Sequence, residues 1–197
     1  MSITNGYCTL EQVKERLNIQ GADNGRDLSI ELAVQGVSRL IDALCHRVFY
    51  SSAASTSRYF TPLNNSYLDI DDLRTVVSIS SDDDGDLDYD NTWAATDYIL
   101  SPLNDTVYTQ VIVSPQGCYA FPILTKSTRI IGTWGYCATG SHPDMIREAC
   151  ILQVNRAWNR RSSPYGVAGT NEMGQALVIS KLDPDVEQYL EPYRRRL

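Results

Sequence analysis

The chain has 197 residues, a hydrophobic fraction of 43% and a formal net charge of −7. This length fits one domain or a domain with a large insertion, and no apolar run is long enough for a membrane helix. The negative charge argues against a protein that wraps nucleic acid by neutralising its phosphates. Residues 1–12 contain neither the basic nor the apolar stretch of a signal peptide, so we expect a protein made and kept in a cytosol-like compartment.

Residues 9–50 predict two helices. Thr9 and Gln12 form a capping box at the start of a short helix over residues 10–19. Asp27 is expected to cap a second, long helix, in which apolar residues recur at i, i+3, i+4 and i+7, the spacing of a face that packs on a core. The apolar positions of this face are Ile30, Ala33, Val34, Val37, Leu40, Ile41, Leu44, Cys45 and Val48.

Residues 51–140 differ from the preceding segment because short β-like runs alternate with turn clusters. This pattern predicts a compact antiparallel insertion. Two tryptophans, Trp93 and Trp134, fall in or beside these runs. We expect them to fill the core of the insertion rather than to stack on a ligand.

Residues 81–91 contain six aspartates and one glycine, a composition similar to that of a calcium-binding loop. With Gly85 at position 6, an EF-hand loop would require a glutamate at position 12, where this chain has Asn91. The flanking residues are β-like, and Asp84-Gly85-Asp86 suits a tight turn. We therefore interpret residues 82–90 as an acidic hairpin tip, and weak cation binding is the alternative.

Helical spacing returns after residue 141. Pro143 is expected at the first position of a long helix that packs against the long helix before the insertion. This helix ends at "NRRSSPYG", where Ser-Pro and Gly stop it. A loop of about twenty residues without regular structure, 162–182, follows, and loops of this length are usually functional. Asp183 and Pro184 then start a last short helix.

These elements together predict an α+β fold class. We expect a small helical bundle, with long helices before and after an antiparallel β insertion, and an extended C-terminal tail. The boundaries are 1–50 for the first part of the bundle, 51–140 for the insertion, and 141–197 for the second part, the long loop and the tail.

The sequence shows no combination of catalytic residues. The two histidines, His46 and His142, have no paired cysteine or serine motif, and no phosphate-binding glycine loop or HExxH motif occurs. The five cysteines show no CxxC spacing, and Cys45 and Cys150 fall on apolar helix faces, which indicates reduced, buried thiols. We expect no enzymatic activity, no cofactor and no metal.

Four segments, in this order along the chain, carry a resemblance to a known family: "TLEQVKERLNI", "VSRLIDALCHRVF", "TVVSISSDDDGDLDYDNTWAATDYIL" and "TRIIGTWGYCATGSHPDMIREACILQVNRAWNRRSSPYGVAG". The chain resembles the head–tail connector (adaptor) proteins of tailed bacteriophages over nearly its whole length. The resemblance implies a virion protein, made in the host bacterial cytoplasm, that forms a dodecameric ring beneath the portal protein at the capsid vertex.

The same resemblance implies a set of partners. Copies of the chain contact one another in the ring, which extends the DNA channel and docks the next connector, stopper or tail-completion protein. DNA passes through the channel without specific binding, and no membrane is involved. The C-terminal segment is implied to reach the portal protein.

Aromatic and arginine side chains near the C-terminus have the chemistry of interface anchors. The segment brings too few apolar residues for a core, so we expect it to bind a groove on the portal and to be dispensable for folding. The expected portal-binding residues are Val186, Tyr189, Leu190, Tyr193, Arg194, Arg195 and Arg196. The expected contacts with neighbouring copies or other partners are Arg160, Arg161 and Tyr165.

Other interpretations remain open from the sequence. The terminal arginines also suit a solvated tail, and Arg160 and Arg161 suit a helix end, where cations favour the dipole. Two other classes of protein are a nucleic-acid-binding module that uses these arginines and a calcium-stabilised binding domain built on the aspartate-rich turn.

Overall fold

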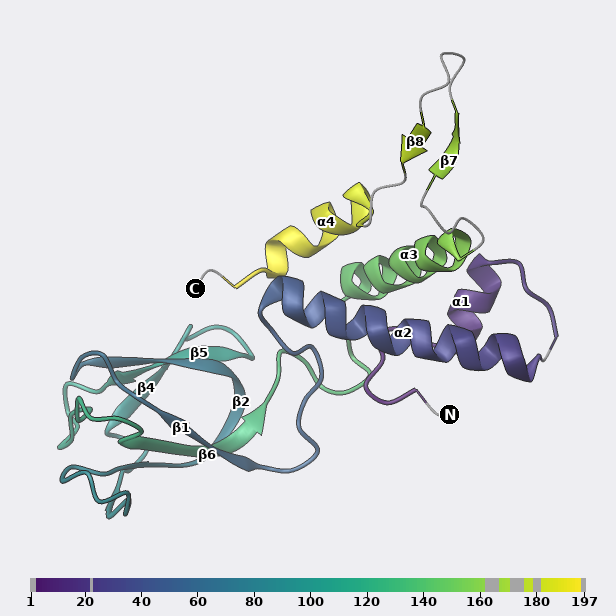
Figure 1. Cartoon of the computed structure of the whole chain (residues 1–197). Coiled ribbons are helices and arrows are strands. Elements are labelled where there is room, and N and C mark those ends of the chain that lie inside the picture. Colours follow the sequence, from purple (N-terminus) through teal and green to yellow (C-terminus); the bar gives the residue numbers. More distant parts are fainter. Residues whose placement is uncertain (1–2, 22, 162–166, 171–175, 179–181, 196–197) are drawn as a thin grey trace. The chain divides into compact units, whose positions relative to one another are not determined.

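The computed structural model describes residues 3–21, 23–161, 167–170, 176–178 and 182–195 (Figure 1). The chain divides into two compact units. The helical unit comprises Met1–His46 and Gly140–Leu197, and the sheet unit comprises Arg47–Thr139. The division into the three stretches expected from the sequence stays a prediction.

The described residues of the helical unit form four α-helices, one 3-10 helix and one pair of antiparallel strands. The helices are α1 (Leu10–Arg16), α2 (Asn24–Cys45), α3 (Asp144–Arg160), α4 (Pro184–Leu190) and the 3-10 helix η1 (Glu191–Tyr193), and the strands are β7 (Val167–Thr170) and β8 (Ala176–Val178). The segment 162–182, expected to lack regular structure, therefore contains a strand pair. No helix in the part of the chain that the structure describes is long and apolar enough to cross a membrane.

The sheet unit is a six-stranded antiparallel sheet in the order β1-β6-β2-β5-β4, with β3 paired to β2. Its strands are β1 (Thr56–Phe60), β2 (Tyr67–Ser81), β3 (Asn91–Thr92), β4 (Tyr98–Ser101), β5 (Tyr108–Val113) and β6 (Thr128–Trp134). The turn expected at residues 82–90 connects β2 to β3. These two strands are antiparallel, and Ser81 at the end of β2 pairs with Asn91 at the start of β3. The hairpin tip is therefore confirmed.

The predicted fold class is wrong. A six-stranded antiparallel sheet dominates the structure, accompanied in the described ranges by four α-helices, and the chain is not a helical bundle with long flanking helices. Strand β2 is the main reason, because it runs for 15 residues and pairs with three other strands. Its first half was not recognised as a strand because Asp69 and Asp71 resemble turn residues, whereas they alternate with the buried Leu68 and Ile70 as strand geometry requires.

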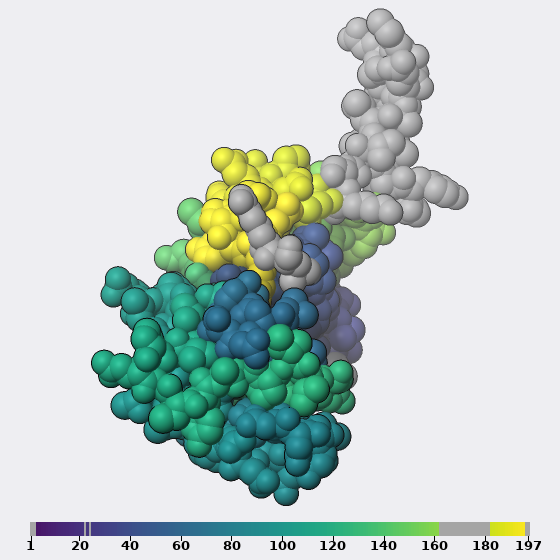
Figure 2. Space-filling view, turned by 90° about the vertical axis from the view of Figure 1, so that its left-hand side faces the viewer, coloured from purple at the N-terminus to yellow at the C-terminus, as the bar shows by residue number. Residues whose placement is uncertain are grey.

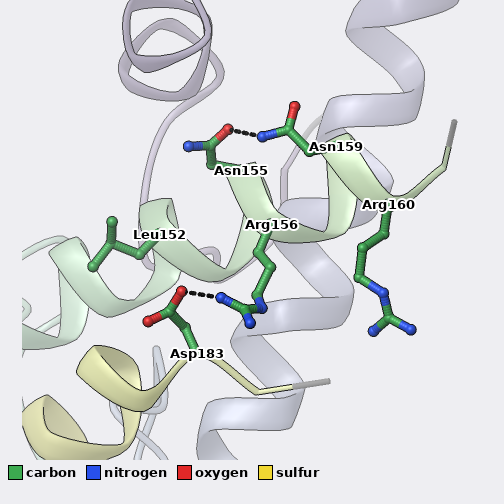
Figure 3. A pocket seen from close by; sticks show the side chains of 6 residues that line it. All are labelled: Leu152, Asn155, Arg156, Asn159, Arg160 and Asp183. Carbon is green, nitrogen blue, oxygen red and sulfur yellow. Dashed lines mark hydrogen bonds and ion pairs between the residues drawn. The ribbon is translucent and has the colours of Figure 1, made fainter. Parts of the chain in front are cut away.

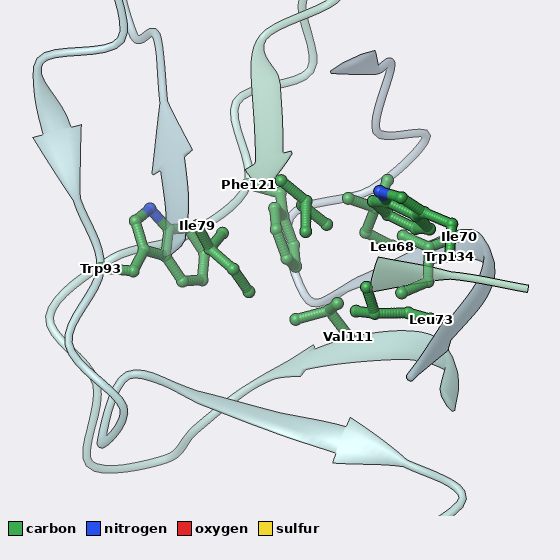
Figure 4. Packing of buried hydrophobic residues seen from close by; sticks show 9 residues of the cluster. Leu68, Ile70, Leu73, Ile79, Trp93, Val111, Phe121 and Trp134 are labelled. Carbon is green, nitrogen blue, oxygen red and sulfur yellow. The ribbon is translucent and has the colours of Figure 1, made fainter. Parts of the chain in front are cut away.

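The core of the sheet unit consists of large apolar side chains that meet between the strands and the loop after β5 (Figure 4). Trp93 stacks on Phe121 with ring centroids 4.7 Å apart, and its Nε1 donates to Ser81 Oγ at 3.1 Å. Trp134 Nε1 donates to the carbonyl oxygen of Thr56 at 2.9 Å. Both tryptophans thus bury their rings and satisfy their N–H groups, which confirms their predicted place in the core. The cluster comprises Leu68, Ile70, Leu73, Ile79, Trp93, Val111, Phe121, Ile130 and Trp134.

Helix boundaries in the helical unit follow from their caps. The Thr9–Gln12 capping box is present as predicted. Asp23, rather than Asp27, caps α2 by accepting from the N–H groups of Gly25 and Arg26, whereas Asp27 lies in the first turn, 2.9 Å from Lys14 Nζ. Helix α2 ends at Cys45 because His46 adopts a left-handed conformation (φ 51°), so the predicted extension to Val48 is wrong.

Helices α2 and α3 pack against each other, as predicted, and α4 lies against α3 and also contacts α2. The buried apolar side chains come from all three helices. They are Ile30, Val34, Val37, Ile41 and Cys45 of α2, Ile146, Ala149, Cys150, Ile151 and Val154 of α3, and Val186 and Leu190 of α4.

Candidate functional site

The C-terminal segment is docked on its own unit. Asp183 caps α4 by accepting from the N–H of Asp185 at 3.0 Å, and Pro184 is the first helical residue, as predicted. Val186 and Leu190 are fully buried. The expected extended tail and its expected lack of core residues are therefore both wrong, because α4 contributes its apolar face to the helical unit.

Polar contacts hold both ends of this segment. Arg156 of α3 forms an ion pair with Asp183, and Asp183 N–H donates to Gln153 Oε1 at 3.2 Å. At the other end, Arg195 N–H donates to the carbonyl oxygen of Cys45 at 2.9 Å. This bond satisfies a carbonyl in the last turn of α2, a group that has no partner within the helix itself.

Several of the predicted portal-binding side chains are partly exposed, and they belong to the segment that is yellow in Figure 2. They are Tyr189, Tyr193 and Arg194. Arg194 lies 3.0 Å from Glu191 and 3.3 Å from Glu187, two exposed carboxylates, so these pairs exchange readily with other partners. Arg195 is also partly exposed, and Arg196 lies outside the described residues. The portal contact stays a prediction.

A shallow pocket of about 270 Å³ separates the end of α3 from the start of α4 (Figure 3). Arg156 and Arg160 leave α3 on the same side, and Asn159 Nδ2 donates to Asn155 Oδ1 at 3.0 Å. Within the described chain, the buried Nε of Arg160 has no hydrogen-bond partner. The pocket therefore offers a cation to a carboxylate or carbonyl. Its lining is Leu152, Asn155, Arg156, Asn159, Arg160 and Asp183.

Arg161, predicted like Arg160 to contact a neighbouring copy or another partner, has a different environment. Its guanidinium lies over the ring of Trp158, 3.4 Å from the centroid. It is exposed and follows the last residue of α3. The predicted contact of Arg160 and Arg161 with neighbouring copies or other partners stays a prediction, and Tyr165 lies outside the described residues.

An exposed apolar row on α2 is the feature that sequence reasoning missed. Leu28, Leu32 and Leu40 are 42%, 51% and 40% exposed, and Gly36 continues their four-residue spacing. This spacing is one of the ridges by which helices interdigitate. Leu40 was assigned to the core because it also fits the buried stripe. The signal in the sequence was the recurrence of leucine and glycine at every fourth position, on the edge of that stripe.

Gly36 gives this α2 row a gap at its centre. A Cβ added there would meet no atom within 4 Å, so nothing else in the described chain requires a glycine. Glycine in a helix interior costs roughly 0.5–1 kcal/mol relative to alanine. An exposed apolar ridge that keeps a glycine, although glycine lowers the stability of the helix, is typical of a surface that another backbone or side chain approaches closely.

The aspartate-rich turn brings three carboxylates together. Oxygen atoms of Asp82, Asp84 and Asp86 lie within 4.8 Å of one another. Asp82, which is 1% exposed, accepts from the N–H groups of Gly85 at 2.7 Å and Leu87 at 2.9 Å. The buried carboxylate thus holds the loop by satisfying its amides, a role that needs no cation.

These contacts change the pKa values of the Asp82 and Asp84 carboxyls in opposite directions. Burial alone would raise the pKa of Asp82, but hydrogen bonds from Gly85 and Leu87 outweigh it and hold that pKa below its ordinary value. For Asp84, a hydrogen bond from Asp86 N–H lowers the pKa. The hydrogen bond to Asp82 and the charges of both neighbours together raise it above its ordinary value.

The two histidines have structural surroundings. His46 is the C-cap of α2, and His142 is buried with its ring edge-on to Tyr7, 4.9 Å between centroids.

Comparison with known proteins gives a likeness of fold. No protein-family model and no curated protein matches the chain. A solved structure described as the neck of an empty gene transfer agent (GTA) particle, computed with C6 symmetry, contains a chain with a TM-score of 0.62 and 14% sequence identity, covering 100% of this chain and 95% of that one. The virion of the native GTA particle contains a chain with a TM-score of 0.60 and 15% identity, at the same coverage.

This likeness extends over both units, because it covers the whole chain. At these identities it establishes a shared fold. The shared fold is consistent with the resemblance to head–tail connector proteins, since both matched chains come from structures of a gene transfer agent particle.

Proposed function

We propose that the chain is a structural, non-enzymatic protein of the neck of a phage-like particle, where it acts as a head–tail connector. The observation that carries the proposal is the full-length likeness to a chain of a GTA neck. A match over both units is more specific than a match to either alone, because it includes the insertion of a sheet unit between α2 and α3.

The proposed role requires a ring of copies with an open channel for DNA. The net charge of −7 and the acidic turn favour this role, because repeated negative charge around a channel repels phosphate. The related neck was computed with C6 symmetry, which is compatible with six or twelve copies in a ring. The dodecamer beneath a portal protein at the capsid vertex, and the docking of a stopper or tail-completion protein, stay predictions.

We assign the contact between neighbouring copies to the α2 row of Leu28, Leu32, Gly36 and Leu40. A ring places the same surface of each copy against another surface of the next, so an apolar ridge exposed in the single chain becomes covered. The portal contact is assigned to the partly exposed Tyr189, Tyr193 and Arg194. Val186 and Leu190 would take part only if α4 left its place in the core.

The test is assembly with the portal protein encoded in the same genome. The full chain and the portal are co-purified, and the complex is measured by mass and by electron microscopy with no symmetry imposed. We expect a closed ring of this chain on one face of the portal. A chain that stays monomeric beside an assembled portal, or binds it without closing a ring, would contradict the proposal.

A further inference from the structure

Two cysteines far apart in the sequence meet inside the helical unit. Cys8 precedes the N-cap of α1, and Cys150 lies in the middle of α3. Their Sγ atoms are 3.3 Å apart across a sequence separation of 142 residues. Cys8 is 5% exposed and Cys150 is fully buried. The connector role requires no such pair, and neither thiol belongs to the surfaces described above.

The surroundings of the pair shift the pKa values of the two thiols in opposite directions. The hydrogen bond from Cys8 lowers the pKa of Cys150, and burial raises it. A hydrogen bond between Ser38 and Cys150, together with hydrogen bonds from the N–H groups of Tyr7 and Cys8, leaves the pKa of Cys150 below its ordinary value. The same bond between the thiols raises the pKa of Cys8, as do its burial and the charge of Cys150. Of the two thiols, Cys150 therefore ionises more readily and is the better nucleophile, and Cys8 holds its proton more tightly.

Two of the other cysteines provide contrasting environments. Cys118 is exposed. Cys137 Sγ donates to the carbonyl oxygen of Phe49 at 2.6 Å, and burial raises its pKa to about 11, so it stays a thiol at neutral pH. Cys150 therefore differs from both in having a second sulfur in contact with it and in a pKa below its ordinary value.

We propose that Cys8 and Cys150 are an oxidation site that closes to an intrachain disulfide between the N-terminal segment and α3. Closure brings the sulfurs from 3.3 Å to about 2.05 Å, a shift within reach of side-chain rotation. In a reducing compartment the pair stays as thiols, and in an oxidising one it closes.

The chemistry balances with hydrogen peroxide as the oxidant. The Cys150 thiolate attacks one peroxide oxygen, the O–O bond breaks, and hydroxide leaves and takes a proton to become water. The Cys8 sulfur then attacks the sulfenic sulfur of Cys150, an S–S bond replaces the S–O bond, and the oxygen leaves as a second water. Both thiols lose their hydrogens, and the peroxide is reduced to water.

A disulfide here would join the two sequence-distant parts of the helical unit and enclose the whole sheet unit in one covalent loop. Crosslinks that close long loops restrict the unfolded chain most. The N-terminal segment ahead of α1 would no longer detach without breaking the bond. We therefore expect oxidation to raise the melting temperature by several degrees.

The test uses the full chain, purified in reductant and then exposed to hydrogen peroxide. The number of free thiols titrated after denaturation should fall from five to three, because the disulfide uses two of the five cysteines. Trypsin cleaves after Lys14, Arg147 and Arg156, so the non-reducing digest should contain residues 1–14 joined to residues 148–156. The intact mass should decrease by two hydrogen atoms, and reductant should reverse each change.

Two variants make the result specific. Cys118→Ser, which removes an exposed cysteine outside the pair, should keep the crosslink and the rise in melting temperature. Cys8→Ser should lose both. If Cys8→Ser does not fold, the wild-type digest decides alone. Peptides 1–14 and 148–156 that stay separate while thiols are lost would overturn the proposal. So would an oxidised chain that melts no higher than the reduced chain.

Discussion

The backbone N–H of Arg195 donates to the carbonyl oxygen of Cys45 at 2.9 Å, which ties the end of the described chain to the last residue of α2. Together with the buried Val186 and Leu190, this bond makes the C-terminal segment part of the helical unit. A segment that binds a partner in this conformation does so with its outer side, and the segment and its unit act as one body.

Removing the apolar anchor of α4 should destabilise the helical unit. Leu190→Ala is expected to lower the free energy of unfolding by about 2–5 kcal/mol, because a fully buried leucine leaves a cavity. Gln188→Ala, at an exposed position of the same helix, should change it by less than about 0.5 kcal/mol. Chemical denaturation of both variants measures the difference. Equal stability of the two would show that α4 does not contribute to the core.

A charge in the α2 row should prevent ring closure. Leu32→Glu is expected to weaken the contact between copies at least about tenfold, because the contact would bury an unpaired carboxylate. Leu103→Glu in the sheet unit, at a position 75% exposed, is the matched control. Analytical ultracentrifugation in the presence of the portal protein measures the mass of the ring. A ring of normal mass from folded Leu32→Glu would place the lateral contact elsewhere.

Substitutions at Gly36 should affect the stability of the single chain and the assembly of the ring differently. Gly36→Ala is expected to raise the free energy of unfolding of the monomer by about 0.5–1 kcal/mol, since the position is helical and open. Gly36→Leu should fold as well but hinder close approach of a neighbouring copy. Thermal melting and ring assembly are compared for the two variants. A destabilised Gly36→Ala monomer would mean that the glycine serves the fold.

The lowered pKa of Asp82 predicts acid sensitivity of the sheet unit. The contribution of this carboxylate to stability is fully present above its ordinary pKa of 3.8 and is lost as the pH falls through the lower pKa of the folded state. Asp82→Asn should flatten the loss of stability below that pH. Asp84→Asn should raise stability at neutral pH. The pKa of Asp84 is raised in the folded state, so its charged carboxylate destabilises the fold, in contrast to that of Asp82. Melting temperature against pH, with Asp105→Asn as the exposed control, measures both.

Calcium should leave the melting temperature unchanged, because Asp82 is already occupied by amide donors and no glutamate closes the loop. A ligand at one hundred times its dissociation constant would add about 2.7 kcal/mol of stability. Melting is compared in millimolar calcium and in chelator. A rise of several degrees that disappears in Asp84→Asn would establish a cation site.

Local signals in the sequence predicted much of the secondary structure. The Thr9–Gln12 box and the Asp183–Pro184 start are short-range patterns, and both were confirmed. Asp27 was predicted as the cap of α2, but Asp23 caps this helix and Asp27 pairs with Lys14, a contact between residues 13 positions apart.

Long-range packing could not be predicted in the same way. The burial of Val186 and Leu190 depends on α3, which lies far earlier in the chain. The exposure of Leu40 depends on which side of the α2 stripe meets that helix. The contact between Cys8 and Cys150 has no local signal, since the two residues share neither a motif nor a spacing.

The two ends of the sheet unit are hydrogen-bonded to each other: Tyr136 N–H donates to the carbonyl oxygen of Val48 at 2.8 Å, and Ser52 N–H donates to that of Trp134 at 2.8 Å. A domain whose two ends lie close together can be inserted into, or removed from, a host chain as one unit. Its coding segment can be exchanged for another whose ends are similarly spaced, without altering the helices on either side. The sheet unit can therefore vary between related chains while the helices before and after it stay the same.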